Sequence, residues 1–104
     1  QGLQWMMADM ATETQASRLM VQAAAQKLDS KKEDVALASM AKMKATDTAM
    51  RVTTDSVQIH GGVGYTTEYP VERYMRDAKV LQIVEGTNQV QKVVIARSLR
   101  KQYS

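Results

Sequence analysis

Two long runs of helical periodicity constrain the fold of this chain most strongly. In the first run, apolar and small residues recur at alternating intervals of three and four positions, which places them on one face of a helix. This stripe consists of Leu3, Met7, Met10, Thr14, Ser17, Val21, Ala24 and Leu28. Polar residues at 29–32 interrupt it, and a second stripe follows, made of Leu37, Ala38, Ala41, Ala45, Thr48, Val52, Ser56 and Ile59. Because the interruption is short, we expect the two helices to pair antiparallel.

The composition of these stripes predicts how they pack. The second stripe is largely Ala, Thr and Ser, so another helix can approach it closely, near the short end of the usual range of about 8–10 Å between axes. Most of the eight methionines lie in the same two segments. Such residues are typical of an adaptable core or a subunit interface rather than of a cofactor site.

Two shorter helices are expected after the second stripe. Gly61, Gly62 and Gly64 end that helix, because glycine tolerates left-handed backbone. Pro70 fits the first turn of a third helix, where its missing N–H has no cost. The apolar face of that helix is expected to be Val71, Tyr74, Met75 and Ala78.

Either Thr87 or Asn88 can cap a last helix. Its buried face is expected to be Val90, Val93, Val94 and Leu99. No segment has the alternating pattern of a strand. We therefore predict an all-α, up-and-down four-helix bundle, with residues 1–104 forming one domain.

Composition excludes several classes of function. The chain of 104 residues has no cysteine, and therefore no disulfide, thiolate metal site or cysteine nucleophile. Its only histidine, His60, rules out a histidine-rich metal site and is better explained as a flank of the glycine turn. The net charge of +3 is scattered and the five aromatic residues are few, so we expect no nucleic-acid binding. No stretch approaches the ~20 apolar residues of a membrane span.

Three motifs together are more specific than any one of them. They are the stretch Gln58-Ile59-His60-Gly61-Gly62-Val63-Gly64-Tyr65, then Pro70, Arg73 and Arg76-Asp77, and finally Glu85-Gly86-Thr87. In this order they resemble the C-terminal signature of the acyl-CoA dehydrogenases of the short- and medium-chain, butyryl-CoA dehydrogenase-like kind. The resemblance extends to Gln1, Gln4-Trp5, Ala8-Asp9-Met10 and Val94-Ile95-Ala96-Arg97. It therefore covers essentially the whole chain.

Glu85 is the candidate catalytic residue. It lies between the apolar Ile83-Val84 and Gly86, where partial desolvation would disfavour its charged form and suit it to act as a general base. From the local sequence alone, an ordinary loop glutamate remains the alternative. The resemblance implies that Glu85 removes the α-proton of an acyl-CoA while a hydride leaves the β-carbon for FAD. It also implies that the Glu85 N–H and a ribityl hydroxyl of FAD stabilise the enolate oxygen, and that Gly86 contacts the substrate.

The resemblance also implies three groups of FAD contacts. They are Gln1; then Gln58, Ile59, His60, Gly61 and Gly62, which would act across a subunit boundary; and then Thr87, Asn88 and Gln89. The last group starts a helix, where free N–H groups and the helix dipole favour phosphate. Arg76 and Asp77 are interpreted as structural. The implied partners are an acyl-CoA substrate and an electron-transfer flavoprotein, in a homotetramer of the bacterial cytoplasm or the mitochondrial matrix.

Two points limit what the resemblance implies. Many relatives have Tyr before the catalytic glutamate where this chain has Val84, so the acyl group is expected to be short, medium or branched. The presence of Glu85 argues against the isovaleryl-CoA branch, which carries its base on an earlier segment. Family members have an N-terminal helical domain and a middle β domain, so we expect this chain to be a fragment of a longer enzyme and inactive alone. The alternative is a non-catalytic helical module that uses the family's tetramer-core surface for self-association.

Overall fold

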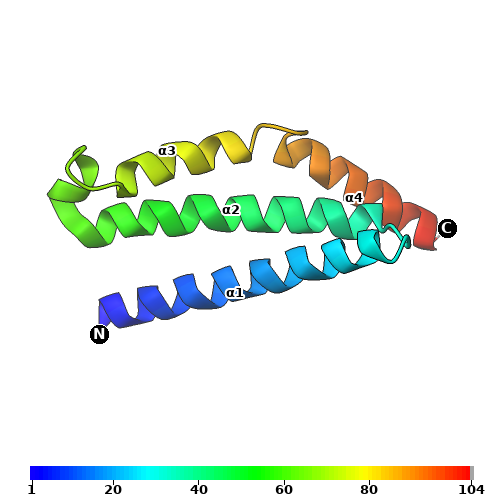
Figure 1. The fold of residues 1–104 in the computed structure, drawn as a ribbon, viewed down its shortest axis with the longest axis horizontal. Helices are drawn as coiled ribbons and strands as arrows, with labels where there is room; N and C mark the ends of the chain where they lie inside the picture. The colour runs from blue at the N-terminus through cyan, green and yellow to red at the C-terminus, as the bar shows by residue number, and fades with distance from the viewer. Residues whose placement is uncertain (104) are drawn as a thin grey trace.

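The computed structural model describes residues 1–103, and these contain four α-helices and no strand. The helices are α1 (Gly2–Asp29), α2 (Val35–His60), α3 (Val71–Leu81) and α4 (Asn88–Tyr103), and a short 3-10 helix, η1 (Gly61–Tyr65), follows α2. Figure 1 shows α1 and α2 as two long rods, with α3 and α4 along the opposite side of α2. The prediction of an all-α fold with four helices is confirmed.

The turn between the two long helices is short and ends in a helix cap. Asp34 precedes α2, and its Oδ1 accepts a hydrogen bond from the N–H of Leu37 at 2.9 Å. This bond satisfies one of the N–H groups that a helix leaves free at its start. The chain therefore reverses over residues 30–34, and α1 and α2 pack antiparallel as predicted.

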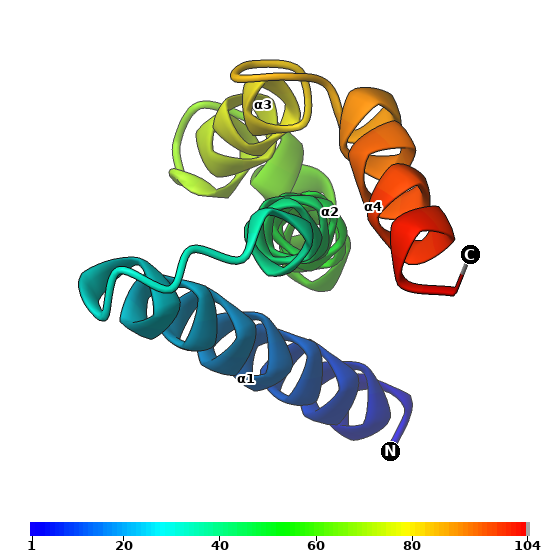
Figure 2. The same ribbon diagram turned by 90° about the vertical axis from the view of Figure 1, so that its right-hand side faces the viewer.

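Helix α2 is the centre of the arrangement. It contacts α1, α3, α4 and η1, whereas no two Cα atoms from α1 and α3, α1 and α4, or α3 and α4 lie within 8 Å among the described residues. The end-on view in Figure 2 shows α2 in the middle, α1 on one side, and α3 and α4 on the other. Because α3 and α4 follow one another along α2, the turn that joins them lies over the middle of α2.

The interior is made of small side chains, and the molecule is elongated. The buried residues among those described are Ser17, Ser39, Ala41, Thr48, Gly64, Ala78 and Asn88. Ala41, Thr48 and Ser39 all lie on α2, which agrees with the predicted close approach along its small-residue face. The radius of gyration is 16.1 Å, and the principal extents are 51 × 27 × 26 Å. A compact domain of this length has a radius of gyration of about 13 Å, so large apolar side chains stay exposed.

The inward face of α1 differs from the predicted stripe. The residues of α1 that are at least half-buried are Met6, Met10, Glu13, Ser17, Met20 and Ala24. The prediction is right at Met10, Ser17 and Ala24, but the other residues of the predicted stripe are exposed: Leu3, Met7, Thr14, Val21 and Leu28. The observed row includes the polar Glu13, which pairs with Lys44 of α2.

The buried face predicted for α4 is also largely wrong. Val90, Val93 and Leu99 are exposed, and of the four predicted residues only Val94 is half-buried. The residues that face α2 instead are Asn88, Gln91, Val94, Ile95 and Ser98. The polar side chain of Asn88 contacts α2 and sets this rotation.

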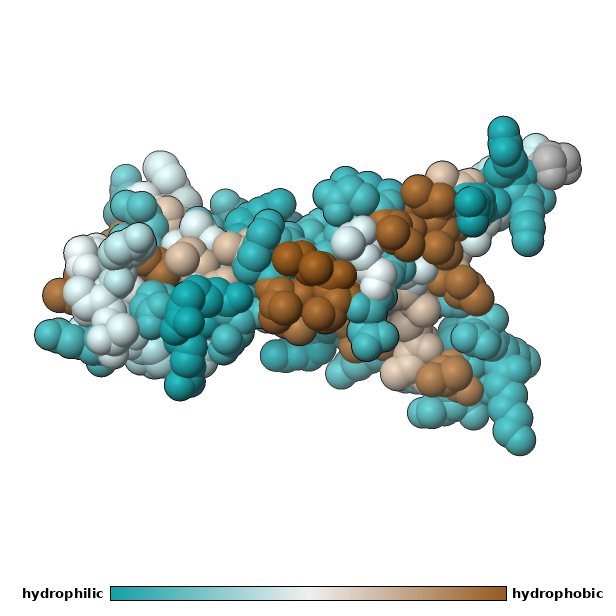
Figure 3. Space-filling view, turned by 90° about the horizontal axis from the view of Figure 1, so that it is seen from above, coloured by the Kyte–Doolittle hydropathy of each residue, from teal (hydrophilic) through white to brown (hydrophobic). Residues whose placement is uncertain are grey.

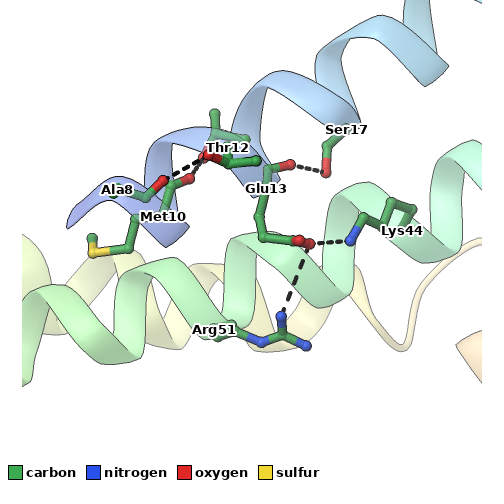
Figure 4. Close-up of polar contacts among 8 residues, drawn as sticks. Ala8, Met10, Thr12, Glu13, Ser17, Lys44 and Arg51 are labelled. Atoms are coloured by element: carbon green, nitrogen blue, oxygen red, sulfur yellow. Dashed lines mark hydrogen bonds and ion pairs between the residues drawn. The ribbon is translucent and has the colours of Figure 1, made fainter. Parts of the chain in front are cut away.

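Glu13 forms an ionic contact between α1 and α2. Its Oε2 accepts a hydrogen bond from Nζ of Lys44 and lies 3.9 Å from Nη1 of Arg51, as Figure 4 shows. About a third of each of the Glu13 and Lys44 side chains is exposed. The hydrogen bond from Lys44, and then the positive charges of Lys44 and Arg51, lower the pKa of Glu13. The pair thus favours the ionised carboxylate in the folded state.

We expect Lys44→Met to lower the free energy of unfolding slightly at neutral pH, and the effect to disappear in acid. The folded-state pKa of Glu13 is below its unfolded value, which is about 4.3 for a free glutamate. The stabilisation is therefore fully present above the unfolded pKa and is lost as the pH falls through the folded pKa. Denaturant unfolding at neutral and at acidic pH measures the free energy of unfolding of Lys44→Met, with the exposed Lys32→Met as control. An equal loss of stability at neutral and at acidic pH would contradict the prediction.

Glycine residues end α2 and let η1 fold back on it. Gly61 has φ 72° and ψ −152°, a region that is essentially restricted to glycine. A Cβ on the buried Gly64 would lie 2.6 Å from Cβ of His60 and 2.8 Å from the carbonyl oxygen of Val57. The predicted glycine turn is thus confirmed, and Pro70 has helical dihedral angles at the position just before α3, rather than inside its first turn.

Gly64→Ala should destabilise the chain by about 1–3 kcal/mol. The added methyl group overlaps Cβ of His60 and the carbonyl oxygen of Val57, and both atoms are fixed by the backbone of α2. Gly62→Ala is the matched control, since no heavy atom lies within 4 Å of the Cβ position there. Chemical denaturation followed by circular dichroism measures the two variants. Similar losses for both would contradict the prediction.

Candidate functional site

The turn at residues 82–87 holds the Glu85-Gly86-Thr87 motif between α3 and α4. Glu85 has φ 56° and Gly86 has φ 84°, so two successive residues are left-handed. That conformation is easy for glycine but costs about 1–2 kcal/mol for a residue with a Cβ. A glutamate persists in it only where the surrounding structure determines the backbone path.

Hydrogen bonds within the turn and to α4 determine part of that path. The N–H of Asn88 donates to the carbonyl oxygen of Gln82 at 3.0 Å and closes the turn. Nε2 of Gln91 donates to the carbonyl oxygens of both Glu85 and Gly86 at 3.2 Å. Gln91 therefore holds Glu85 and Gly86, the two left-handed residues, through their carbonyl oxygens.

Helix α2 supplies the rest of the support. Nζ of Lys42 donates to the carbonyl oxygen of Gly86 at 2.9 Å and to Oδ1 of Asn88 at 2.7 Å. Nδ2 of Asn88 donates to Oδ1 of Asp47 at 2.6 Å, and Nε2 of Gln82 donates to the same oxygen at 2.8 Å. Asn88 is only 5% exposed. Lys42 and Asp47, which are half-buried on α2, thus hold the turn through the buried Asn88 and through Gln82.

Glu85 itself is exposed, and so are its apolar neighbours Ile83 and Val84. Figure 3 views this side of the molecule and shows apolar side chains gathered at mid-length and again toward the C-terminal end. The predicted desolvation of Glu85 is therefore not supplied by residues 1–103. Neither the carboxylate nor the N–H of Glu85 has a hydrogen-bond partner among those residues. Both groups are available to a ligand.

The start of α4 resolves which residue is the cap. Oγ1 of Thr87 accepts a hydrogen bond from the N–H of Val90 at 3.2 Å, so Thr87 is the cap. The side chain of Asn88 accepts from Lys42 and donates to Asp47. Its predicted contact with FAD stays a prediction. Thr87 and the exposed Gln89 remain accessible.

A hollow of about 200 Å³ lies beside the start of α4. Its lining includes Thr87, Gln89, Lys79 and Lys92, and also the acidic residue Asp47. The two lysines and the hydroxyl of Thr87 suit an anionic group such as a phosphate. The carboxylate of Asp47, which accepts hydrogen bonds from Gln82 and Asn88, opposes an anion there.

The other predicted cofactor contacts lie elsewhere on the chain. Gln1 is exposed at the start of α1, and residues 58–62, which were predicted as a group, end α2 and begin η1. Both lie toward one end of the long axis in Figure 1, whereas the Glu85 turn lies over the middle of α2. One copy of the chain therefore does not gather the three groups into one site.

His60 and Arg76 make contacts within the chain, and their predicted roles, His60 as an FAD contact and Arg76 as a structural residue, stay predictions. Nδ1 of His60 lies 2.8 Å from the carbonyl oxygen of Ser56, and its ring centroid is 5.8 Å from that of Tyr69. Arg76 pairs with Glu72 one helical turn earlier at 2.8 Å. Within residues 1–103 no group of His, Asp and Glu side chains could hold a metal ion, and no helix is long and apolar enough to cross a membrane.

The supporting residues were missed in the sequence. Lys42, Asp47, Gln82 and Gln91 lie in three separate segments, and no short motif joins them. The available signal was weak: Lys42, Lys44 and Asp47 are the charged residues within the largely small and apolar stretch 36–50 of α2. Such residues on a central helix indicate a buried polar contact.

Comparisons with known proteins agree with the motif order. Residues 1–100 match the family described as "Acyl-CoA dehydrogenase, C-terminal domain". The "Probable acyl-CoA dehydrogenase FadE25" of Mycobacterium tuberculosis H37Rv is 55% identical over 100 residues, which are 95% of this chain and 26% of that protein. This chain belongs to the acyl-CoA dehydrogenase family, and it corresponds to the C-terminal domain of that family.

Two solved structures share the fold closely. The structure of butyryl-CoA dehydrogenase from Megasphaera elsdenii matches with a TM-score of 0.93 and 49% identity, covering 95% of this chain and 26% of that one. A chain in the structure "Electron transferring flavoprotein of Acidaminococcus fermentans: Towards a mechanism of flavin-based electron bifurcation" matches with a TM-score of 0.94 and 56% identity, again covering 95% and 26%. This chain thus spans about a quarter of the length of these relatives.

Proposed function

We propose that this chain is the C-terminal domain of an FAD-dependent acyl-CoA dehydrogenase in which Glu85 removes the α-proton of an acyl-CoA thioester. The observation that carries the proposal is the Glu85 turn: a carboxylate and a backbone N–H, both without partners within residues 1–103, on a left-handed turn whose carbonyl groups are held. The carboxylate takes the proton as the α C–H bond breaks. The product is the trans-2-enoyl-CoA.

The N–H of Glu85 has a separate part in this reaction. An α-proton beside a thioester is too weakly acidic for a free carboxylate, so the negative charge that develops on the thioester oxygen needs a fixed donor. Glu85 offers its own N–H, and the donor is fixed because Lys42 and Gln91 hold the adjoining carbonyl groups. Exposed Ile83 and Val84 give the acyl chain apolar neighbours. One residue then provides both the base and an oxyanion donor.

FAD fits the polar groups that this chain leaves accessible. Thr87, Gln89, Lys79 and Lys92 line the hollow beside the start of α4 together with Asp47, and the first four can donate to a phosphate of the cofactor. When bound, FAD supplies the acceptor for the hydride that leaves the β-carbon. We assign Gln1 and the 58–62 segment to a cofactor bound with a neighbouring subunit, because they lie toward one end of the long axis, away from the Glu85 turn over the middle of α2. Asn88 acts through its contacts to α2.

Assembly and electron transfer complete the proposal. Exposed apolar side chains on α1 and α4, including Met7, Val21, Val90 and Val93, suit burial against other domains and other copies in a homotetramer. The electrons are proposed to pass to an electron-transfer flavoprotein. The fit to a chain in a structure named for such a flavoprotein supports this partner.

Anaerobic mixing of the full-length flavoprotein with butyryl-CoA tests the function. We expect the flavin absorbance to fall. Mass spectrometry should show that the acyl-CoA product has two hydrogen atoms fewer than the substrate. The isolated 104-residue chain with added FAD should give neither signal. Absence of flavin reduction with short, medium and branched acyl-CoA substrates alike would refute the proposal.

A non-catalytic self-association module is the second candidate. The observation that favours it is the elongated shape with many exposed apolar side chains and no large side chain fully buried in the described chain. Sedimentation of the native polypeptide over a concentration series, with its flavin content and turnover, distinguishes the two. A stable oligomer of the native polypeptide without flavin or turnover would favour the module.

A further inference from the structure

One carboxylate oxygen connects both ends of the Glu85 turn. Oδ1 of Asp47 accepts from Gln82, the residue after α3, and from Asn88, the first residue of α4. The distances are 2.8 Å and 2.6 Å. Asp47 lies at the middle of α2, so it fixes the two ends of the turn relative to one element.

Lys42 completes this contact one helical turn earlier on α2. Its Nζ donates to the carbonyl oxygen of Gly86 and to Oδ1 of Asn88, at 2.9 Å and 2.7 Å. The amide of Asn88 therefore lies between an ammonium and a carboxylate. Hydrogen bonds with one ionised partner are shorter and stronger than neutral ones. We call Lys42, Asp47, Gln82 and Asn88 the turn clamp.

The clamp matters because the Glu85 side chain has no contact of its own that fixes it within residues 1–103. Its carboxylate makes no hydrogen bond there, and its side chain is exposed. Its position depends on the backbone, which is left-handed at φ 56° and needs support from outside. The clamp and Gln91 provide that support through the carbonyl groups and the ends of the turn.

We propose that Asp47 and Lys42 are positioning residues for the base, and this inference rests on the proposed function of Glu85. They hold the turn in the position on α2 that presents the carboxylate and the N–H of Glu85 to the substrate. A displacement of about 1 Å in a reacting group can cost 10²-fold in rate. The clamp therefore acts on turnover although neither residue touches the substrate.

The experiment uses the full-length enzyme with Asp47→Ala, Asp47→Asn and Lys42→Met. We expect Asp47→Ala to lower kcat, counted per bound flavin, by about 10²-fold with a much smaller change in KM. Asp47→Asn keeps an acceptor oxygen and should recover part of the loss. Lys44→Met is the matched control, because Lys44 lies two positions from Lys42 but pairs with Glu13 on α1. It should retain wild-type turnover.

A double-mutant cycle separates positioning from general damage. With Glu85→Gln present there is no base to position, so adding Asp47→Ala should reduce the residual rate by no more than about tenfold, against 10²-fold with Glu85 intact. Fully additive losses, or wild-type kcat in Asp47→Ala, would overturn the inference. Hydrogen exchange gives a readout that does not need catalysis: the amides at 83–91 should lose protection in Asp47→Ala while those of α1 do not.

These outcomes separate this inference from the proposed function. Full turnover in Glu85→Gln alone would remove Glu85 as the base, and the exchange data would then still decide whether Asp47 clamps the turn. Loss of turnover in Glu85→Gln, together with unchanged exchange and rate in Asp47→Ala and Lys42→Met, would leave the function in place and reject the clamp.

Discussion

Glu85→Gln should lower kcat of the full-length enzyme by about 10²- to 10⁴-fold, the range typical of a positioned general base. The amide has nearly the same size as the carboxylate but cannot accept the α-proton. Glu85 is exposed and its side chain has no hydrogen-bond partner within residues 1–103, so the replacement removes no packing or polar contact there. Stability should change by no more than about 0.5 kcal/mol. Stopped-flow reduction of the flavin under anaerobic conditions measures the effect.

Two further variants define the result. Glu68→Gln makes the same chemical change at an exposed residue before α3 and should keep full activity. Glu85→Asp retains a carboxylate but draws it back by one methylene group, so its rate should fall between those of the wild type and Glu85→Gln. Wild-type flavin reduction in Glu85→Gln would mean that another group removes the proton.

Helical periodicity was sufficient to predict the four helices and their order. The spacing of small residues on α2 also predicted its close contacts, and Ala41 and Thr48 are indeed buried. These features are local, because each depends on residues within a few turns of one another. Turn chemistry was equally local: the glycines that end α2 lie where predicted, and Gly61 has the positive φ that requires glycine.

Helix rotation could not be predicted in the same way. On α1, the row with Met7 and Val21 is as apolar as the row with Met6 and Met20, yet the second row faces α2. On α4, the apolar Val93 is exposed while polar residues face inward. In the enzyme that we propose, other domains and subunits cover these apolar rows. Hydrophobic pattern reports burial in the whole assembly, whereas the contacts between α1, α2 and α4 depend on specific polar pairs.

The candidate site also has a local part, which the sequence could predict, and a long-range part, which it could not. The Glu-Gly-Thr motif is contiguous, so the sequence could offer Glu85 and Gly86 as candidates and Thr87 as a cap, and the cap is confirmed. The turn clamp joins residues 35 to 46 positions apart, and its hydrogen bonds depend on how α3 and α4 lie on α2. Such long-range polar contacts leave no periodic signal. The environment of Glu85 was wrongly predicted for a related reason, since apolar neighbours in sequence need not cover a side chain.

Asn88→Ala should lower the free energy of unfolding by roughly 1–3 kcal/mol, because removing a buried hydrogen-bonding group leaves its partners unsatisfied. Asn88 is 5% exposed and bonds to both Lys42 and Asp47. Its loss also removes a contact between α4 and α2, so the amides of α4 should lose protection against hydrogen exchange before those of the other helices. Chemical denaturation of the 104-residue chain at one fixed concentration, with hydrogen exchange along α4, measures both effects.

Asn88→Asp provides the sharper comparison. A carboxylate can still accept from Lys42, but it has no hydrogen to donate to Asp47, whose Oδ1 lies 2.6 Å from Nδ2 of Asn88. Two carboxylates at this distance repel each other unless one is protonated. Asn88→Asp should therefore be less stable than Asn88→Ala at neutral pH and should regain stability as the pH falls. Gln89→Ala, at the adjacent exposed position, should stay within about 0.5 kcal/mol of the wild type. Equal stability of Asn88→Asp and wild type at neutral pH would mean that the amide does not donate to Asp47, and that the turn is held by Lys42 and Gln91 instead.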